Sequence, residues 1–337
     1  MLKSCMVVAM VGAMAAPVMA ADLNATVNGR TRTWLESVAV KDGGSTMQFK
    51  ADGRLGASVS ATSGEWTVTA FQNVDIDSDS DKASPTIREQ YITIGNETMD
   101  ITLGRTAPYG ISKGMTYTAG PIYNAYWIGE NVPTTDVTDH LIVNLKEVGL
   151  TVILGMNDYN EADATGDARS ETLVGLVYGK QFGAIDFAVE YLSASSKVDE
   201  YAADGQVDGA YDGGKFSALA LGVDYAISET MDVALNYESN SATAGNDGAE
   251  ADKNTAMELW FSMGLGGDSG VSVGYTTVSS DDGSAEKGTK TITNLAYLNK
   301  VGIASLYANY LIETEKDDDD ATDTSVTTIA VGAAVYF

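Results

Sequence analysis

The sequence predicts an all-β protein, a closed barrel of sixteen antiparallel strands that crosses a membrane. Three observations predict it. Runs of about 9–14 residues, rich in Val, Thr, Ile, Tyr and Leu, alternate in polarity with a period of two, which is typical of strands with two different faces. The connections between these runs are alternately short and long. No stretch of 18 apolar residues follows residue 21, so membrane-spanning helices are excluded.

The chain begins with a segment of different character. Lys3 precedes an apolar run over residues 5–16, and residues 18–20 match the small-residue rule for signal cleavage. The run is too short to span about 30 Å of hydrocarbon as an anchor. We therefore expect a secretory signal peptide over residues 1–20 and a barrel over residues 21–337.

Charge and composition exclude several function classes. After residue 20 the chain keeps 19 basic residues against 47 acidic ones, a net charge of −28, which disfavours nucleic acid as a partner because like charges repel. Cys5, the single cysteine, leaves with the signal. His140, the single histidine, disfavours histidine-based zinc sites and Ser-His-Asp or Cys-His catalysis. We expect no enzyme, no metal site and no cofactor.

Sixteen runs carry the strand pattern, and the short connections between them all fall at one end of an up-and-down barrel. A soluble sandwich with Greek-key crossings would not alternate so regularly. The predicted strands are 24–38, 46–61, 64–75, 86–96, 98–105, 139–146, 148–158, 170–182, 184–194, 215–228, 230–241, 254–265, 269–280, 289–300, 302–313 and 325–337.

The faces of these strands fit an apolar exterior and a polar interior. Strand 230–241 places Met, Val, Leu and Tyr on one face and Asp, Asn and Glu on the other, whereas both faces of strand 215–228 are fairly apolar. Tyrosine outnumbers phenylalanine 17 to 7 and often falls near strand ends, which predicts aromatic girdles at the membrane interfaces. The tyrosines concerned are Tyr91, Tyr191, Tyr237, Tyr275 and Tyr336.

The last strand ends in Tyr336 and Phe337, with alternating apolar residues before them. A terminal aromatic residue on such a strand closes a barrel against its first strand, and it resembles the signal by which outer-membrane barrels reach their assembly machinery. Five short motifs add to this, in order: Asn28-Gly29-Arg30, residues 53–56, residues 88–95, residues 100–105 and residues 108–110. With these motifs the chain resembles the general Gram-negative porins.

The resemblance implies a homotrimer in the bacterial outer membrane, in contact with lipid and lipopolysaccharide. Each barrel would be a water-filled channel for passive diffusion of small hydrophilic solutes and ions. The third external loop of such porins folds inward and narrows the channel, and the segment 106–138 takes that place here. It holds three of the four prolines that follow the signal, together with several aromatic residues, a composition that favours a packed loop.

The resemblance also implies a constriction with a basic and an acidic side. Strand parity supports Arg30, Arg32 and Arg54 on the basic side. Arg88 is a further candidate. The resemblance adds Arg105, but Arg105 shares parity with Ile101 and Leu103, so a bulge would be needed to turn it inward. On the acidic side we expect Glu130 and Asp136.

Two other functions remain open at this point. One is a substrate-specific channel of similar form, for a sugar or an organic acid, and the other is an acidic exported adhesin or surface protein. The acidic runs 75–81 and 317–320 are most simply solvated loops, with a weak divalent-cation site as the alternative. The surplus of acid predicts a channel that favours cations, moderated by the arginines.

Overall fold

A computed structural model describes residues 23–77, 86–106, 140–159, 169–198, 215–243, 252–281, 287–317 and 324–337. These residues form sixteen β-strands. The strands are β1 (Leu23–Val40), β2 (Ser45–Ser63), β3 (Trp66–Asp77), β4 (Thr86–Gly95), β5 (Met99–Arg105), β6 (His140–Leu145), β7 (Leu150–Tyr159), β8 (Arg169–Phe182), β9 (Ile185–Val198), β10 (Lys215–Ser228), β11 (Met231–Thr243), β12 (Asp252–Gly266), β13 (Ser269–Asp281), β14 (Lys287–Val301), β15 (Ala304–Asp317) and β16 (Thr324–Tyr336).

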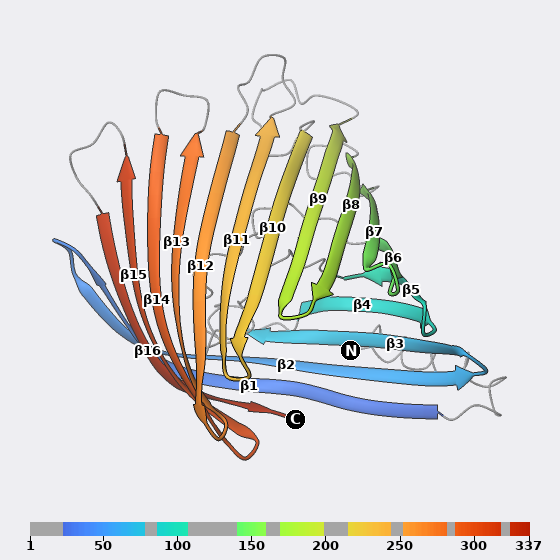
Figure 1. Cartoon of the computed structure of the whole chain (residues 1–337), viewed down its shortest axis with the longest axis horizontal. Helices are drawn as coiled ribbons and strands as arrows, with labels where there is room; N and C mark the ends of the chain where they lie inside the picture. The colour runs from blue at the N-terminus through green and yellow to red at the C-terminus, as the bar shows by residue number, and fades with distance from the viewer. Residues whose placement is uncertain are drawn as a thin grey trace.

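The strands form one closed antiparallel barrel in sequence order, with β1 hydrogen-bonded to both β2 and β16. Figure 1 shows β9–β15 side by side as one continuous wall. Closure leaves every strand paired on both sides, which a hydrocarbon environment requires. All sixteen predicted strands are confirmed, and no boundary differs by more than four residues. No helix in the described part of the chain is long and apolar enough to cross a membrane.

Tight turns join the strands at one end of the barrel. Gly183 and Gly302, with φ of 62° and 63°, take the left-handed conformation that such turns need. At the other end the β1–β2 connection is also tight, spanning residues 41–44. The sequence predicts a longer loop over residues 39–45; the difference arises because Val38 and Ala39 continue the ladder with Thr46 and Ser45.

The two faces of the barrel separate clearly by exposure. On β12, Met257 and Leu259 are 51% and 53% exposed, while Glu258 and Trp260 between and beside them are 1% and 0% exposed. Met257 and Leu259 therefore point outward, whereas Glu258 and Trp260 point toward the lumen. The same parity resolves β10, where Leu219 is outward and 40% exposed.

Two of the five tyrosines predicted for an aromatic girdle, Tyr191 and Tyr275, face outward and are 46% and 48% exposed. Outward-facing tyrosines that are 40% or more exposed lie on β9, β10, β13 and β15: Tyr191, Tyr225, Tyr275 and Tyr310. Tyr91 instead faces inward and contacts Phe71, with ring centroids 5.0 Å apart. Tyr336 is likewise wrong as a girdle residue, because it takes the inward parity opposite Arg30.

The seam between the first and last strands is tightly packed. Gly29 N–H donates to the Phe337 carbonyl at 2.7 Å, and Phe337 N–H donates to the Gly29 carbonyl at 3.1 Å. A Cβ atom at position 29 would lie 2.6 Å from the Phe337 ring and 2.7 Å from the Arg54 carbonyl oxygen. Glycine at this position therefore lets the terminal aromatic ring lie against β1.

Candidate functional site in the barrel lumen

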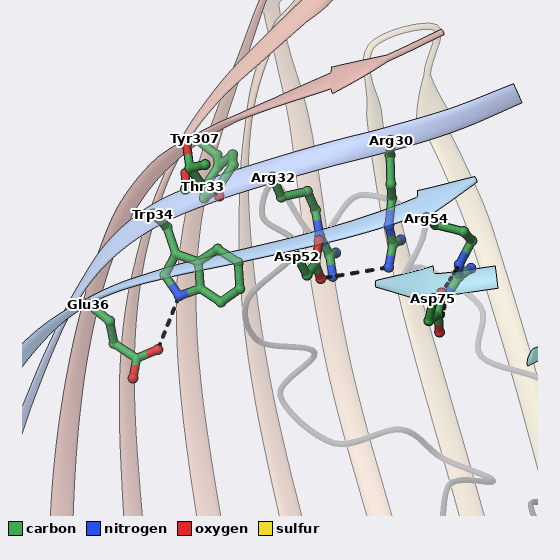
Figure 2. Close-up of polar contacts among 9 residues, drawn as sticks. All are labelled: Arg30, Arg32, Thr33, Trp34, Glu36, Asp52, Arg54, Asp75 and Tyr307. Atoms are coloured by element: carbon green, nitrogen blue, oxygen red, sulfur yellow. Dashed lines mark hydrogen bonds and ion pairs between the residues drawn. The ribbon is translucent and has the colours of Figure 1, made fainter. Parts of the chain in front are cut away.

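Three arginines of β1 and β2 meet on the lumen side of the wall (Figure 2). Arg30 and Arg32 lie two positions apart on β1, so their side chains leave the same face of the strand. Arg54 on β2 is the direct partner of Arg30 in the ladder. The opposite, outward face is marked by Val27 and Leu55, which are 67% and 48% exposed.

Two aspartates hold two of these arginines in two-pronged ion pairs. Arg54 donates from Nε to Asp75 Oδ1 at 2.6 Å and from Nη2 to Asp75 Oδ2 at 3.2 Å. Arg32 donates from Nε to Asp52 Oδ1 at 2.6 Å, and its Nη2 donates to Asp52 Oδ2. Parallel charge-assisted bonds of this kind fix the plane of the guanidinium group. Asp75 thus belongs to a strand and an ion pair, not to the solvated loop that its acidic run suggests.

Arg30 is held differently. Its Nη2 lies 3.9 Å from Asp52 Oδ2, the oxygen that Arg32 already uses. Its Nε is buried and has no hydrogen-bond partner in the described part of the chain. Arg30 also faces Arg54 directly across the ladder, a placement that destabilises like charges. The cluster of Arg30, Arg32, Arg54, Asp52 and Asp75, which we call the arginine cluster, therefore carries a net charge of +1.

A buried carboxylate lies four residues after Arg32, on the same face of β1. Glu36 is 2% exposed and accepts from Gln48 at 3.1 Å and from the Trp34 indole at 3.3 Å. Lys50 Nζ lies 3.2 Å from its Oε1. These partners compensate the cost of burying the charge, and they hold the lumen side of the β1–β2 hairpin in one arrangement.

The opposite wall of the lumen is acidic. In a ring of sixteen strands, β9 lies eight positions from β1. Glu190, Glu238 and Glu258, on β9, β11 and β12, face inward and are 1–2% exposed. We call these three residues the acidic wall. The described lumen-facing positions of β9–β12 carry no lysine or arginine.

Amide and hydroxyl groups hold two carboxylates of this wall, those of Glu258 and Glu238. Asn236 donates to Glu258 Oε1 at 2.8 Å, and Thr276 donates to Glu258 Oε2 at 3.3 Å. Asn240 donates to Glu238 Oε1 at 2.9 Å. Donors of this kind stabilise a carboxylate without cancelling its charge. The lumen is thus bounded by a positive cluster on one side and a negative wall on the other.

The structure brings three of the predicted site residues together and separates a fourth. Arg30, Arg32 and Arg54 share the lumen face of β1 and β2. Arg105 is the ladder partner of Gln90, takes the outward parity of Leu103 and is exposed. The positive φ of Gly104, 126°, does not turn Arg105 inward, so its assignment to the basic side of the constriction is wrong.

Three other predicted residues have side chains outside the described part of the chain. Arg88 lies on β4, but its side chain is not among those described. Glu130 and Asp136 also lie outside the described residues, as does the whole segment 107–139. Their places on the two sides of a constriction stay predictions.

Sequence reasoning missed the aspartates and the acidic wall. Asp52 lies two positions before Arg54, so parity could have placed both on one face. Glu190, Glu238 and Glu258 are far apart in sequence, and only the strand register brings them to one side. In the described residues no group of three or more His, Cys, Asp or Glu side chains is arranged to hold a metal ion.

The chain matches one protein family by sequence and several solved structures by fold. A family model of Gram-negative porins matches residues 7–336. No curated protein matches the chain by sequence. Among solved structures, a loop L8 deletion mutant of OmpT, an outer membrane protein of Vibrio cholerae, has a TM-score of 0.68 and 14% identity, covering 94% of this chain and 99% of that one.

Two further structures are similar over nearly their whole length. The anion-selective porin from Comamonas acidovorans has a TM-score of 0.67 and 14% identity, with 94% of this chain and 100% of that chain covered. The outer membrane channel DcaP of Acinetobacter baumannii has a TM-score of 0.65 and 16% identity, with 94% and 97% covered. The closed sixteen-stranded barrel, its polar lumen and the family match agree. The chain therefore belongs to the Gram-negative porins, channel-forming β-barrels of the bacterial outer membrane.

Proposed function

We propose that this porin is a general diffusion channel that favours cations, with a transverse field across its lumen and no catalytic role. The observation that carries the proposal is the separation of charge between the arginine cluster on β1–β3 and the acidic wall on β9–β12. Charged side chains that line a narrow pore set its ion preference. The acidic wall holds three carboxylates, whereas the arginine cluster is largely neutralised by its own aspartates.

The proposal is tested by conductance in planar bilayers under a KCl gradient. We expect a zero-current potential that is positive on the dilute side, because K⁺ crosses faster than Cl⁻. A potential of the opposite sign would reject the cation preference. A purified barrel that inserts but conducts nothing would reject the channel itself. Liposome swelling with neutral sugars of increasing size separates general diffusion, which falls smoothly with size, from a substrate-specific channel.

We also propose that the segment 106–138 narrows the channel against the wall of β6–β10. Support comes from an apolar cluster on lumen-facing positions: Ile153, Leu173, Leu192 and Ala218, which are 1–5% exposed. Ile142 on β6, close to the end of the segment, packs against it. Apolar side chains facing bulk water would be unfavourable, and an aromatic segment that begins and ends beside them would cover them.

A homotrimer is the assembly that we propose, with outer-membrane lipid and lipopolysaccharide around it. The in-vitro folded OmpT of Vibrio cholerae is described in a trimer form. Here the strongly exposed outward tyrosines lie on strands from β9 to β15, whereas β2 exposes Met47 and Phe49 by 69% and 84%. Tyrosine suits a lipid interface. The exposed apolar residues of β2 suit contact with a second copy.

Truncating Phe49 tests this assembly. We expect Phe49→Ser to lower the fraction of trimer, because the side chain with the largest exposed apolar fraction on β2 is lost from the contact. The matched control is Leu259→Ser on the outward face of β12, which should leave the trimer intact. Unheated gel migration and light scattering in detergent measure the outcome. Equal effects of the two variants would contradict the assignment of the β2 face.

The terminal Phe337 is proposed as the contact for the barrel assembly machinery. Phe337 as a residue is 60% exposed, while its backbone is bound to Gly29. Before β16 closes against β1, the side of this aromatic ring that does not face Gly29 is available to a partner.

A further inference from the structure

We infer that Arg30 is the residue of the arginine cluster that contacts permeating anions, and that Asp52 and Asp75 mask the other two arginines. The inference rests on the proposed channel function and names the solutes that its basic side contacts: small solutes bearing a carboxylate or phosphate group. The three arginines differ in their contacts, and the inference states which of them a solute can bind.

Arg54 and Arg32 have the Nε edge of their guanidinium groups occupied by a carboxylate. Each presents Nε and one terminal nitrogen to both oxygens of one aspartate. This is the edge with which a guanidinium group binds carboxylate or phosphate in two-pronged fashion. A solute anion that approaches this edge would have to displace the aspartate, and there it would lose as many charge-assisted bonds as it gained.

Arg30 is more exposed than its two neighbours and is not held by a carboxylate of its own. Its side chain is 26% exposed, against 12% for Arg32 and 19% for Arg54. Its nearest carboxylate oxygen, 3.9 Å away, already accepts from Arg32. The Nε donor of Arg30 has no partner in the described part of the chain. A buried donor without an acceptor is unfavourable, so the Nε side of this guanidinium group lacks the carboxylate that fixes Arg32 and Arg54.

The surroundings of Arg30 also favour an anion over a neutral solute. Arg54 lies directly opposite on β2, and Arg32 lies two positions along β1. Their repulsion of Arg30 is only partly offset by Asp52, which is shared. A monoanion at Arg30 would balance the net +1 of the cluster. On the other ladder Tyr336 is the partner of Arg30 and is 50% exposed, which adds a phenol at the same level of the wall.

The ion pairs of Asp52 and Asp75 lead to a specific prediction about replacing one of these aspartates. If Asp75 neutralises Arg54, then Asp75→Asn exposes a second guanidinium group beside Arg30. Anion binding then increases, although the residue that was changed never touches the anion. If all charges of the lumen acted only through their sum, the position of the removed carboxylate would not matter.

The experiment compares two pairs of variants, matched in net charge. Arg30→Gln and Lys290→Gln each remove one positive charge from the lumen side, and Lys290 is engaged by Glu313. Asp75→Asn and Asp232→Asn each remove one negative charge, and Asp232 accepts from Ser262 rather than from a cation. The readouts are the Cl⁻/K⁺ permeability ratio in planar bilayers and the reduction of KCl current by inorganic phosphate.

We expect Arg30→Gln to lower the permeability ratio by about threefold, since one unscreened charge acts at pore distances, and to weaken phosphate inhibition. Asp75→Asn should raise both. Lys290→Gln and Asp232→Asn should change both less than their matched partners. Arg30→Lys, which keeps the charge but not the fork, should retain the permeability ratio and weaken phosphate inhibition. That variant also carries the test if Arg30→Gln fails to assemble, as judged by heat-modifiable gel migration.

Each contrary result has a distinct meaning. Equal effects within the matched pairs would overturn the inference, because net charge alone would then explain the selectivity. A wild-type channel that conducts KCl but is insensitive to phosphate would overturn the anion contact and leave the proposed channel intact. Absence of any conductance from correctly folded trimers would reject the proposed function, and the inference with it.

Discussion

Replacing Gly29 with valine is expected to prevent most of the chain from closing into a barrel. The Cβ atom alone would lie 2.6 Å from the Phe337 ring and 2.7 Å from a carbonyl oxygen of β2. The ring could move, but the β2 backbone is held in the ladder on both sides. Overpacking of this kind costs about 1–3 kcal/mol in ordinary cores, and here it acts on the one seam that closes the sheet.

The measurement is the heat-modifiable fraction on an unheated gel after refolding into detergent or lipid. A suitable control is Gly179→Val on β8, where the nearest neighbour of a new Cβ would be 3.9 Å away. The control should fold normally, because valine is favourable in strands. Normal closure of the Gly29 variant would show that Phe337 and β1 can separate without loss of the barrel.

Neutralising the acidic wall is expected to remove the cation preference. The triple variant Glu190→Gln, Glu238→Gln, Glu258→Gln keeps the shape of each side chain while replacing the three buried carboxyl groups on one side of the lumen with neutral amides. Each charge contributes about 0.5 kcal/mol at about 8 Å in water, reduced by salt. We therefore expect the K⁺/Cl⁻ permeability ratio to fall by about tenfold at low salt.

The control removes three negative charges from the turns instead. Glu65, Glu97 and Glu147 are exposed in tight connections, where solvent screens them. Their glutamine variants should change the zero-current potential only slightly. If the two triple variants shift it equally, surface charge at the channel mouths sets the ion preference, and the acidic wall has no special part in it.

The strands could be predicted because the lipid-facing barrel imposes a strict local rule. Each strand must alternate along its length, and each tight turn needs residues such as Gly183 or Gly302 that adopt positive φ. Both signals lie within a few residues of one another in the sequence. The ambiguous strand 215–228 shows the limit of this rule: its inward face is built from Ala218, Ala220 and Gly222, so polarity alone did not distinguish it from the outward Leu219 and Leu221.

The site could be predicted only where parity within one strand was enough. Arg30 and Arg32 share a face by spacing alone, and Arg54 joins them through the first hairpin. The pairing of Arg54 with Asp75 depends on the register between β2 and β3, which no local pattern states. Arg105 shows the opposite error: the resemblance of short motifs to porins suggested an inward side chain against its own parity, whereas the ladder with Gln90 places it outward.

The contact between β1 and β16 is of the same chemical kind as the other strand contacts of the ring. The wall of the barrel therefore does not depend on which pair of neighbouring strands is left without a connecting turn. Joining the two ends with a flexible linker and opening the chain at the Gly183 turn would give a circular permutant with an unchanged wall.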